Sequence, residues 1–521
     1  MSTTDRPRPA PADTTSRAQP LAGPAAGVVA GWAGLAAGWV TAQLAEAKES
    51  PVSAVAEQII DRLPGPLVEQ GIRRLGHHDK QVLVVLVLVV VTLAFALAGR
   101  LGRRTPWWPI GIFGGASLLA GLAVARQPGT GGRDELAVVL GFVVSVCGWR
   151  FLAIGPAGPA APRTDPGPPA GADRRFWLRA GLVAAGTAAA TAVLPRLGRA
   201  RRAVESARSR LHIPGLRPAV VPTGADLGLA EPWATPTTSF YRVDIDVTVP
   251  YVDPDSWRLR IHGMVDHELE LTFAELVARR RTNAWITLNC VSNPVGGDLI
   301  GNAWWSGVRL RDLLAEAGVH SGADAVLQTA ADGWTCGTPL SALTDDRPAI
   351  LAVAMNGEAL PIAHGFPVRT VVPGLYGYVS ACKWVVDLEV TTIDKAVGYW
   401  IPLGWAVRGP VKLASRIDRP RSGATVSAGS YRIAGVAWEQ EVGVAAVEVS
   451  VDGGAWRRTR LARVPSVDTW VQWAVEVDLE PGSHRARVRA VDRDGTVQTS
   501  VQRDVAPDGA TGWHEVDFTA H

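Results

Sequence analysis

Long apolar runs in the first two hundred residues constrain this chain more than any other feature. The run Gln81–Ala98 holds "VLVVLVLVVVTLAFALA" and, at about 1.5 Å per residue, nearly crosses a hydrocarbon core of about 30 Å. Runs of similar kind are Ala25–Ala45, Trp107–Val124, Leu136–Ile154 and Phe176–Leu194. We therefore predict five transmembrane helices within residues 25–200, in contact with membrane lipid, after a cytoplasmic tail over residues 1–24. Buried core helices are the alternative.

Two segments between these runs have other compositions. Pro51–Gly76 places apolar residues at helical spacing, with prolines interrupting it, which is typical of a segment lying at the membrane interface. Gly155–Ala172 is rich in Pro, Gly and Ala and predicts a flexible linker.

Arg174 and Arg175 precede the fifth run, as the two arginines of a twin-arginine export signal would. The alternative is that they are cytoplasmic charges flanking a helix. Because the twin-arginine route exports folded proteins, this signal predicts that the rest of the chain folds in the cytoplasm and then lies on the extracytoplasmic side of the cell membrane.

The rest of the 521-residue chain has the pattern of two soluble domains. A net charge of +3 with scattered arginines gives no support for nucleic-acid binding. Residues 218–411 mix alternating strand patterns with short helical patterns such as Leu310–Gly318, which predicts an α+β domain. Residues 412–521 contain short alternating strands with turns at Asp452-Gly453 and Asp494-Gly495, which predicts an immunoglobulin-like β-sandwich.

Three of the four cysteines give no clear chemical signal. Cys147 lies in an apolar run, where a small buried hydrophobic residue is expected. Cys336 and Cys382 lack the CxxC spacing of a zinc or redox motif. The sequence leaves open whether these two form a disulfide.

Cys290 differs because it ends a buried-strand pattern, Trp285–Leu288, and is followed by a loop rich in Gly and Asn. It could be a structural residue, a thiol nucleophile assisted by His364, or a soft ligand to a metal. A single protein ligand suffices where an organic cofactor supplies the others. That third hypothesis predicts an anion-binding site nearby, and His364, Arg369 and Lys383 are its candidate donors.

Several long motifs then resemble one family. "LNCVSNPVGGDLIGNAWWSGVRLRDLL", "MNGEALPIAHGFPVRTVVPG" and "CKWV" look like the molybdenum-cofactor domain of the sulfite oxidase family. "DGGAW" and "PDGATGWHEVDF" look like that family's molybdenum-oxidoreductase dimerisation domain. The resemblance extends from about Gly224 to the C-terminus, and it implies a sulfite oxidase-type molybdopterin-binding domain.

The resemblance implies that Cys290 is the thiolate ligand of a molybdenum bound by molybdopterin and oxo groups. It implies oxygen-atom transfer, with Cys290 and Arg242 as catalytic residues. The positions that would contact the cofactor are Phe240, Tyr241, Arg242, Asp244, Cys290, Asp332, His364, Arg369, Ser380 and Lys383.

Two departures concern the substrate. Sulfite-oxidising members carry Arg at the position of Val295 and Tyr at the position of Val353, and a third substrate-binding Arg is absent from Ala437–Ser450. The substrate is expected to be a small oxo-acid or oxo compound, with a sulfoxide or other oxo-compound reductase as the alternative to sulfite oxidation. A non-catalytic membrane scaffold is a further alternative. The resemblance also implies a homodimer, and the lack of a C-x-x-C-H haem motif predicts a separate electron-transfer partner.

Overall fold

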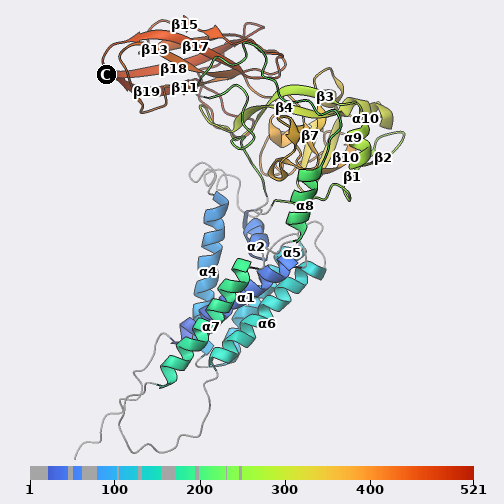
Figure 1. The fold of residues 1–521 in the computed structure, drawn as a ribbon, viewed down its shortest axis with the longest axis vertical. Helices are drawn as coiled ribbons and strands as arrows, with labels where there is room; N and C mark the ends of the chain where they lie inside the picture. The colour runs from blue at the N-terminus through green and yellow to red at the C-terminus, as the bar shows by residue number, and fades with distance from the viewer. Residues whose placement is uncertain are drawn as a thin grey trace, which may run out of the picture. The chain divides into compact units, whose positions relative to one another are not determined.

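The computed structural model describes residues 22–44, 51–60, 79–102, 105–126, 132–153, 171–193, 199–229, 231–245 and 249–521. The chain divides into two compact units, Met1–Arg199 and Ala200–His521. The first is helical, whereas the second contains all the described strands (Figure 1).

Four helices of the first unit are long and apolar enough to cross a membrane, with apolar parts over Gly23–Ala42, Val82–Gly102, Trp107–Ala125 and Glu135–Leu152. This confirms four of the five predicted spans as long apolar helices. The fifth is helical, but the apolar part described in it, Leu178–Ala189, is too short to cross a hydrocarbon core. The helices of this unit are α1 (Ala22–Leu44), α2 (Pro51–Ile60), α4 (Asp79–Gly102), α5 (Trp107–Ala125), α6 (Gly132–Ala153) and α7 (Gly171–Val193).

Helix α1 packs against α4, α6 and α7 through small residues. A Cβ atom on Gly27 would lie 2.1 Å from the carbonyl oxygen of Phe95, and one on Gly99 would lie 2.1 Å from that of Gly23. Such close backbone approach is typical of helices that associate without large apolar side chains between them. It explains why an Ala- and Gly-rich run forms the best-buried helix of this unit.

Some sequence predictions for this unit are corrected or lie outside the described residues. Cys147 is exposed on α6, not buried, because a uniformly apolar helix has no pattern that marks its packed face. Helix α2 covers the start of the predicted interfacial segment, whereas residues 61–78, most of the linker and most of the tail lie outside the described residues. So do the side chains of Arg174 and Arg175.

The contact at Gly27 gives a stability prediction. Gly27→Val should lower the unfolding free energy of the helical unit by about 1–3 kcal/mol, because the added side chain has no space against α4. Gly115→Val is the matched control, since no atom lies within 4 Å of a Cβ placed there. Thermal unfolding of the detergent-solubilised protein measures both. Equal midpoints for the two variants would show that this contact is not tight.

The first part of the second unit contains two sheets. One has the strand order β2-β1-β10-β5-β6, and the other has the order β3-β4-β7-β8 with β9 paired to β7. The strands are β1 (Arg258–Gly263), β2 (Leu269–Thr272), β3 (Thr282–Asn289), β4 (Ile300–Arg309), β5 (Ala325–Ala330), β6 (Thr335–Pro339), β7 (Ile350–Met355), β8 (Glu358–Ala359), β9 (Arg369–Val371) and β10 (Val385–Thr391).

Short helices accompany these sheets: α9 (Phe273–Ala278), α10 (Leu310–Ala317) and α11 (Leu340–Thr344). The predicted helix at Leu310 is confirmed, with its leucines buried and Gly318 ending it at a φ of 71°. The sequence analysis missed α8 (Arg199–Arg210), whose Arg208 donates hydrogen bonds to the carbonyl oxygens of Ala359 and Leu360. This helix is therefore part of the second unit.

The last part of the second unit has only strands, as predicted. They form a four-stranded sheet, β11-β13-β17-β16, and a five-stranded sheet, β12-β19-β18-β14-β15, around a shared apolar core. We call this part the C-terminal β-domain. Its strands are β11 (Ala414–Arg419), β12 (Thr425–Val426), β13 (Gly429–Trp438), β14 (Val444–Val451), β15 (Arg457–Arg458), β16 (Arg460–Leu461), β17 (Val471–Leu479), β18 (Gly482–Asp492) and β19 (His514–Ala520).

The turn between β14 and β15 has positive φ at Asp452 (52°) and Gly453 (73°), as its sequence predicts. The immunoglobulin-like topology, the homodimer and the border between residues 411 and 412 stay predictions. Of the tryptophans in this domain, Trp438, Trp470 and Trp473 are buried, whereas Trp456 packs edge-on against Trp513 with ring centroids 4.9 Å apart.

The C-terminal β-domain binds strand β3 just before Cys290. The Thr287 amide donates to the Asp468 carbonyl oxygen at 2.9 Å, and the Trp470 amide donates to the Thr287 hydroxyl at 2.8 Å. The Gln440 side chain donates to the carbonyl oxygens of Thr287 and Asp468 at 2.7 and 2.9 Å. All these groups are buried. We call this set of contacts the Thr287 seam.

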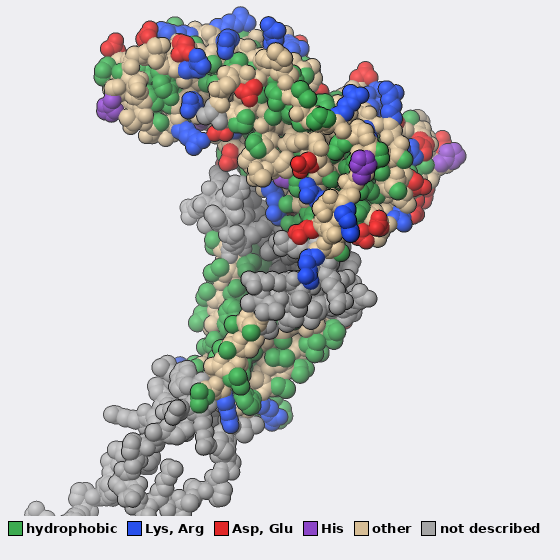
Figure 2. Space-filling model, viewed as in Figure 1, with side chains coloured by type: hydrophobic (Ala, Val, Ile, Leu, Met, Phe, Trp, Pro, Cys, Tyr) green, Lys and Arg blue, Asp and Glu red, His purple; other side chains and the backbone are tan. Residues whose placement is uncertain are grey.

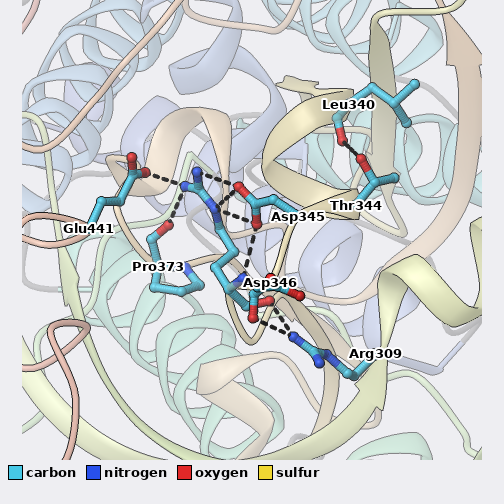
Figure 3. Close-up of polar contacts among 8 residues, drawn as sticks. Arg309, Leu340, Thr344, Asp345, Asp346, Pro373 and Glu441 are labelled. Atoms are coloured by element: carbon cyan, nitrogen blue, oxygen red, sulfur yellow. Dashed lines mark hydrogen bonds and ion pairs between the residues drawn. The ribbon is translucent and has the colours of Figure 1, made fainter.

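A second contact between the two parts is centred on Arg347. Figure 3 shows Asp345, Glu441 and the Pro373 carbonyl oxygen converging on one guanidinium, which belongs to Arg347. Asp345 precedes β7, whereas Glu441 follows β13 of the C-terminal β-domain. The planar fork of Arg suits such a set of acceptors, so this contact holds the Pro373 loop against the β-domain.

The Thr287 seam gives a second stability prediction. Thr287→Val should lower the unfolding free energy by about 1–3 kcal/mol, because the Trp470 amide would stay buried without its acceptor. Thr344→Val is the control, since the Thr344 hydroxyl is exposed and only donates back to Leu340 in its own helix. Chemical denaturation of the two variants and wild type checks this. A loss in Thr344→Val as large as that in Thr287→Val would contradict it.

Candidate active site

Cys290 lies directly after β3, at the start of a loop that folds back on itself. Its amide donates to the Leu299 carbonyl oxygen at 2.9 Å, and its carbonyl oxygen accepts from the Asn293 amide at 3.1 Å. The Asn293 side chain then accepts from the Leu299 amide at 3.0 Å. These bonds fix the cysteine relative to both ends of the loop. The predicted position, at the end of a buried strand, is confirmed.

The Cys290 thiol is 9% exposed. Burial raises its pKa above the ordinary value, and hydrogen bonds from Ser292 only partly offset this effect. A buried thiol that stays protonated near neutral pH is a poor nucleophile, which argues against the thiol-nucleophile alternative. A metal would reverse this balance, because its positive charge favours the thiolate.

Phe240, Tyr241, His364 and Arg369 come together beside the strands that carry Cys290. The Phe240 ring stacks on Tyr241 and packs edge-on against His364, with centroids 5.2 and 5.8 Å apart. Both Arg369 and Cys290 act electrostatically on the buried Tyr241 phenol, whose pKa is raised mainly by burial. These four predicted site residues therefore surround one region next to the thiol.

Arg369 is a buried cation held by backbone oxygens. It donates to the carbonyl oxygens of His364 and Thr370 at 3.2 and 3.4 Å, and its guanidinium lies 5.1 Å from the Trp305 ring centroid. Burial lowers its pKa to about 10, so it stays charged at neutral pH. Burial and the Arg369 charge lower the pKa of His364 to about 4, so its imidazole is neutral. The pair can hold an anion.

Arg242, Asp244 and Lys383 form a second charged group. The Asp244 carboxylate pairs with both Arg242 and Lys383. Lys383 also donates to the Val243 carbonyl oxygen at 3.0 Å and lies 4.7 Å from the Trp384 ring centroid. Asp244 thus holds both cations in place, and Arg242 remains the more exposed of the two, with 42% of its side chain accessible.

Two predicted site residues have other contacts. The Ser380 hydroxyl is fully buried and donates within its own loop, to the carbonyl oxygens of Leu375 and Tyr376. Asp332 accepts from the Trp334 amide at 3.0 Å and acts electrostatically on Cys382. Their cofactor contacts stay predictions. Cys336 and Cys382 are both free thiols, so the disulfide left open by the sequence does not form in the structure.

The sequence analysis missed Asn289 and Tyr376. The Asn289 side-chain oxygen is buried next to Cys290 and has no hydrogen-bond partner among the described residues. An unpaired buried acceptor suits a ligand with N–H donors, such as a pterin. The Tyr376 phenol is buried and lies within electrostatic range of Cys290. A polar residue inside a buried strand was the signal for Asn289, whereas Tyr376 is brought near only by folding.

Comparisons with known proteins agree with this site. A family model described as the oxidoreductase molybdopterin binding domain matches residues 246–400. Sulfite oxidase from Gallus gallus is 32% identical over 343 residues, which cover 55% of this chain and 73% of that protein. The uncharacterized oxidoreductase YuiH from Bacillus subtilis (strain 168) is 35% identical over 182 residues, which cover 35% of this chain and 88% of that protein.

Among solved structures, the crystal structure of the sulfane dehydrogenase SoxCD from Paracoccus pantotrophus aligns with a TM-score of 0.49 and 24% identity, over 56% of this chain and 84% of that chain. The assignment rests on the sequence relatives and on the family model, whose match lies within the domain that carries Cys290. It implies a molybdenum cofactor, which the buried acceptor and the cation cluster fit. The chain is a molybdopterin-dependent oxidoreductase and belongs to the sulfite oxidase family.

Proposed function

We propose that this chain is a membrane-anchored oxidoreductase that catalyses oxygen-atom transfer on the extracytoplasmic side, with Cys290 as the protein ligand of molybdenum. The observation that carries the proposal is the fixed, buried position of Cys290 at the end of β3. The thiol lies within electrostatic range of the Tyr241 phenol and directly after Asn289. When bound, the cofactor supplies the two-electron redox chemistry.

The chain's own residues would bind and orient that cofactor. Arg369 and Lys383 supply positive charge and His364 a neutral imidazole for its phosphate. The Asn289 oxygen can accept a hydrogen bond from the pterin. Phe240 and Trp305 exclude water on the side of His364 and Arg369, because both rings are almost fully buried.

The helical unit supports a membrane anchor. Large apolar side chains lie exposed along α4 and α5, for example Leu93 at 64% and Leu119 at 67%. Figure 2 shows apolar side chains over the described surface of these helices, whereas charged side chains are spread over the second unit. Such an apolar surface is costly in water and favourable in lipid. Because the sequence lacks a C-x-x-C-H haem motif, we propose that electrons pass to or from a separate partner.

The first test is the molybdenum content of the detergent-extracted full chain. We expect about one molybdenum atom per wild-type chain, and expect Cys290→Ala to abolish turnover because the metal loses its protein ligand. Cys336→Ala is the control for loss of a buried thiol outside the metal site, and it should keep metal and turnover. Wild-type turnover in Cys290→Ala would overturn the assignment of the ligand. Absence of molybdenum from wild type would favour a scaffold.

The second test concerns the side of the membrane. Ser483→Cys, on the exposed start of β18, in a Cys147→Ala background, should react with a membrane-impermeant maleimide in intact cells. Adding Arg174→Lys with Arg175→Lys should prevent labelling in intact cells while leaving it in permeabilised cells, because export would be blocked. Labelling of the Ser483→Cys, Cys147→Ala protein only after permeabilisation would place the domain in the cytoplasm.

A further inference from the structure

A surface segment, residues 397–410, lies on the loop that carries Tyr376 and Tyr378. The Tyr376 amide donates to the Gly409 carbonyl oxygen at 2.7 Å. The Tyr378 hydroxyl donates to the Ala406 carbonyl oxygen, also at 2.7 Å. These bonds fix the segment, which we call the 397–410 segment, against one side of the loop.

The other side of that loop contacts the candidate active site. A Cβ atom on Gly377 would lie 3.8 Å from the Asn289 carbonyl oxygen and 3.9 Å from the Tyr241 hydroxyl. Asn289 directly precedes Cys290. A single loop therefore lies between the 397–410 segment and the strand end that carries Cys290. Because the rate of electron transfer between proteins falls steeply with the distance between redox centres, a carrier bound to this segment would be close enough to exchange electrons with the site.

Aromatic rings form a rigid base for the 397–410 segment. Trp405 is 8% exposed, and its ring packs against Tyr378 and Trp400 with centroids 5.9 and 6.3 Å away. In the same segment Val397 and Val407 are 48% and 43% exposed. Single exposed valines are ordinary on a protein surface, so the charge beside them decides what this surface can bind.

That charge belongs to Arg408, which directly follows Val407 and is exposed. Its side chain has no hydrogen-bond or ion-pair partner among the described residues. Lys412, a few residues further on, differs because it pairs with Asp508 at 2.9 Å. Residues 395–412 contain no acidic residue. The segment thus presents an unpaired guanidinium next to a small apolar surface, which suits a partner that offers carboxylates.

We propose that the 397–410 segment is the docking surface for the separate electron carrier, and that this carrier is a protein with carboxylates around a small apolar centre. This inference rests on the oxidoreductase function proposed for the Cys290 site and assigns the surface that its partner would use. Arg408 pairs with a carboxylate of the carrier, and the two exposed valines contact its apolar centre. A second copy of this chain fits less well, because a two-fold axis here would bring Arg408 toward its own copy.

The first measurement is binding of cytochrome c to the full chain in detergent at low salt. Succinylated cytochrome c has the same haem as native cytochrome c but an acidic surface, so it should bind about tenfold more tightly, and added salt should weaken it. Arg408→Glu should weaken binding of the succinylated protein about tenfold, because a carboxylate then faces carboxylates. Arg460→Glu is the matched control and should have little effect. It changes the net charge equally, and Arg460 is exposed on β16 without an acidic partner among the described residues.

The second measurement is electron transfer from the molybdenum-loaded enzyme. Two equivalents of titanium(III) citrate supply two electrons, which then pass one at a time to two ferric haems of succinylated cytochrome c. Arg408→Glu should slow this step about tenfold in stopped flow, because a charge at the rim of an interface acts mainly on association. The rate with uncharged 1,4-benzoquinone, which takes two electrons and two protons, should stay at the wild-type value.

Equal weakening by Arg408→Glu and Arg460→Glu would overturn the assignment of this surface. Equal or tighter binding of native cytochrome c would overturn the acidic chemistry of the partner. A wild-type dimer that dissociates in Arg408→Glu, measured by light scattering, would assign the segment to a second copy instead. Binding can be measured with or without the metal. Failure of the proposed function itself would therefore appear separately, as absent molybdenum or as turnover in Cys290→Ala.

Discussion

The position of Cys290 depends on hydrogen bonds to strand β3 from two directions. On one side β3 pairs with β4 over its whole length, from Thr282 opposite Gly307 to Asn289 opposite Ile300. On the other side the Thr287 seam supplies backbone and side-chain partners from the C-terminal β-domain. A strand held in this way cannot shift its register, because a shift by one residue would turn every side chain to the opposite face. The cysteine that ends it is therefore fixed.

Most of the cations named around this strand are paired with acidic side chains. Arg347, Arg416 and Lys412 each connect or brace segments next to the site, and each has an acidic partner. Arg369 is the exception, because it is buried and bound only to backbone oxygens and an aromatic face. A buried cation without a carboxylate partner is costly unless an anion joins it. The structure thus concentrates its capacity for a bound anion at Arg369, which is where the resemblance implied a cofactor contact.

Much of the fold could be predicted from local pattern. The run at Gln81, the helix at Leu310 and the turn at Asp452 each have a signal within a few residues, and the structure confirms them. The motif around Cys290 predicted both its strand-end position and the family. Contacts between distant segments had no such signal: Thr287 and Trp470 lie 183 residues apart, and Gln440 and Thr287 lie 153 apart. For the same reason Tyr376 was missed, and the hydrogen bonds of Ser380 within its own loop could not be foreseen.

The burial of the site bears on how a cofactor reaches it. Tyr241, Cys290 and Arg369 come from three separate segments, and Cys290 and Arg369 are almost fully buried in the closed unit. Because a buried site takes shape only as these segments meet, binding of a large cofactor is coupled to folding. The cofactor would then be inserted in the compartment where the chain folds. An export route for folded proteins satisfies this requirement, so the twin-arginine prediction and the buried geometry of the Cys290 site have the same consequence.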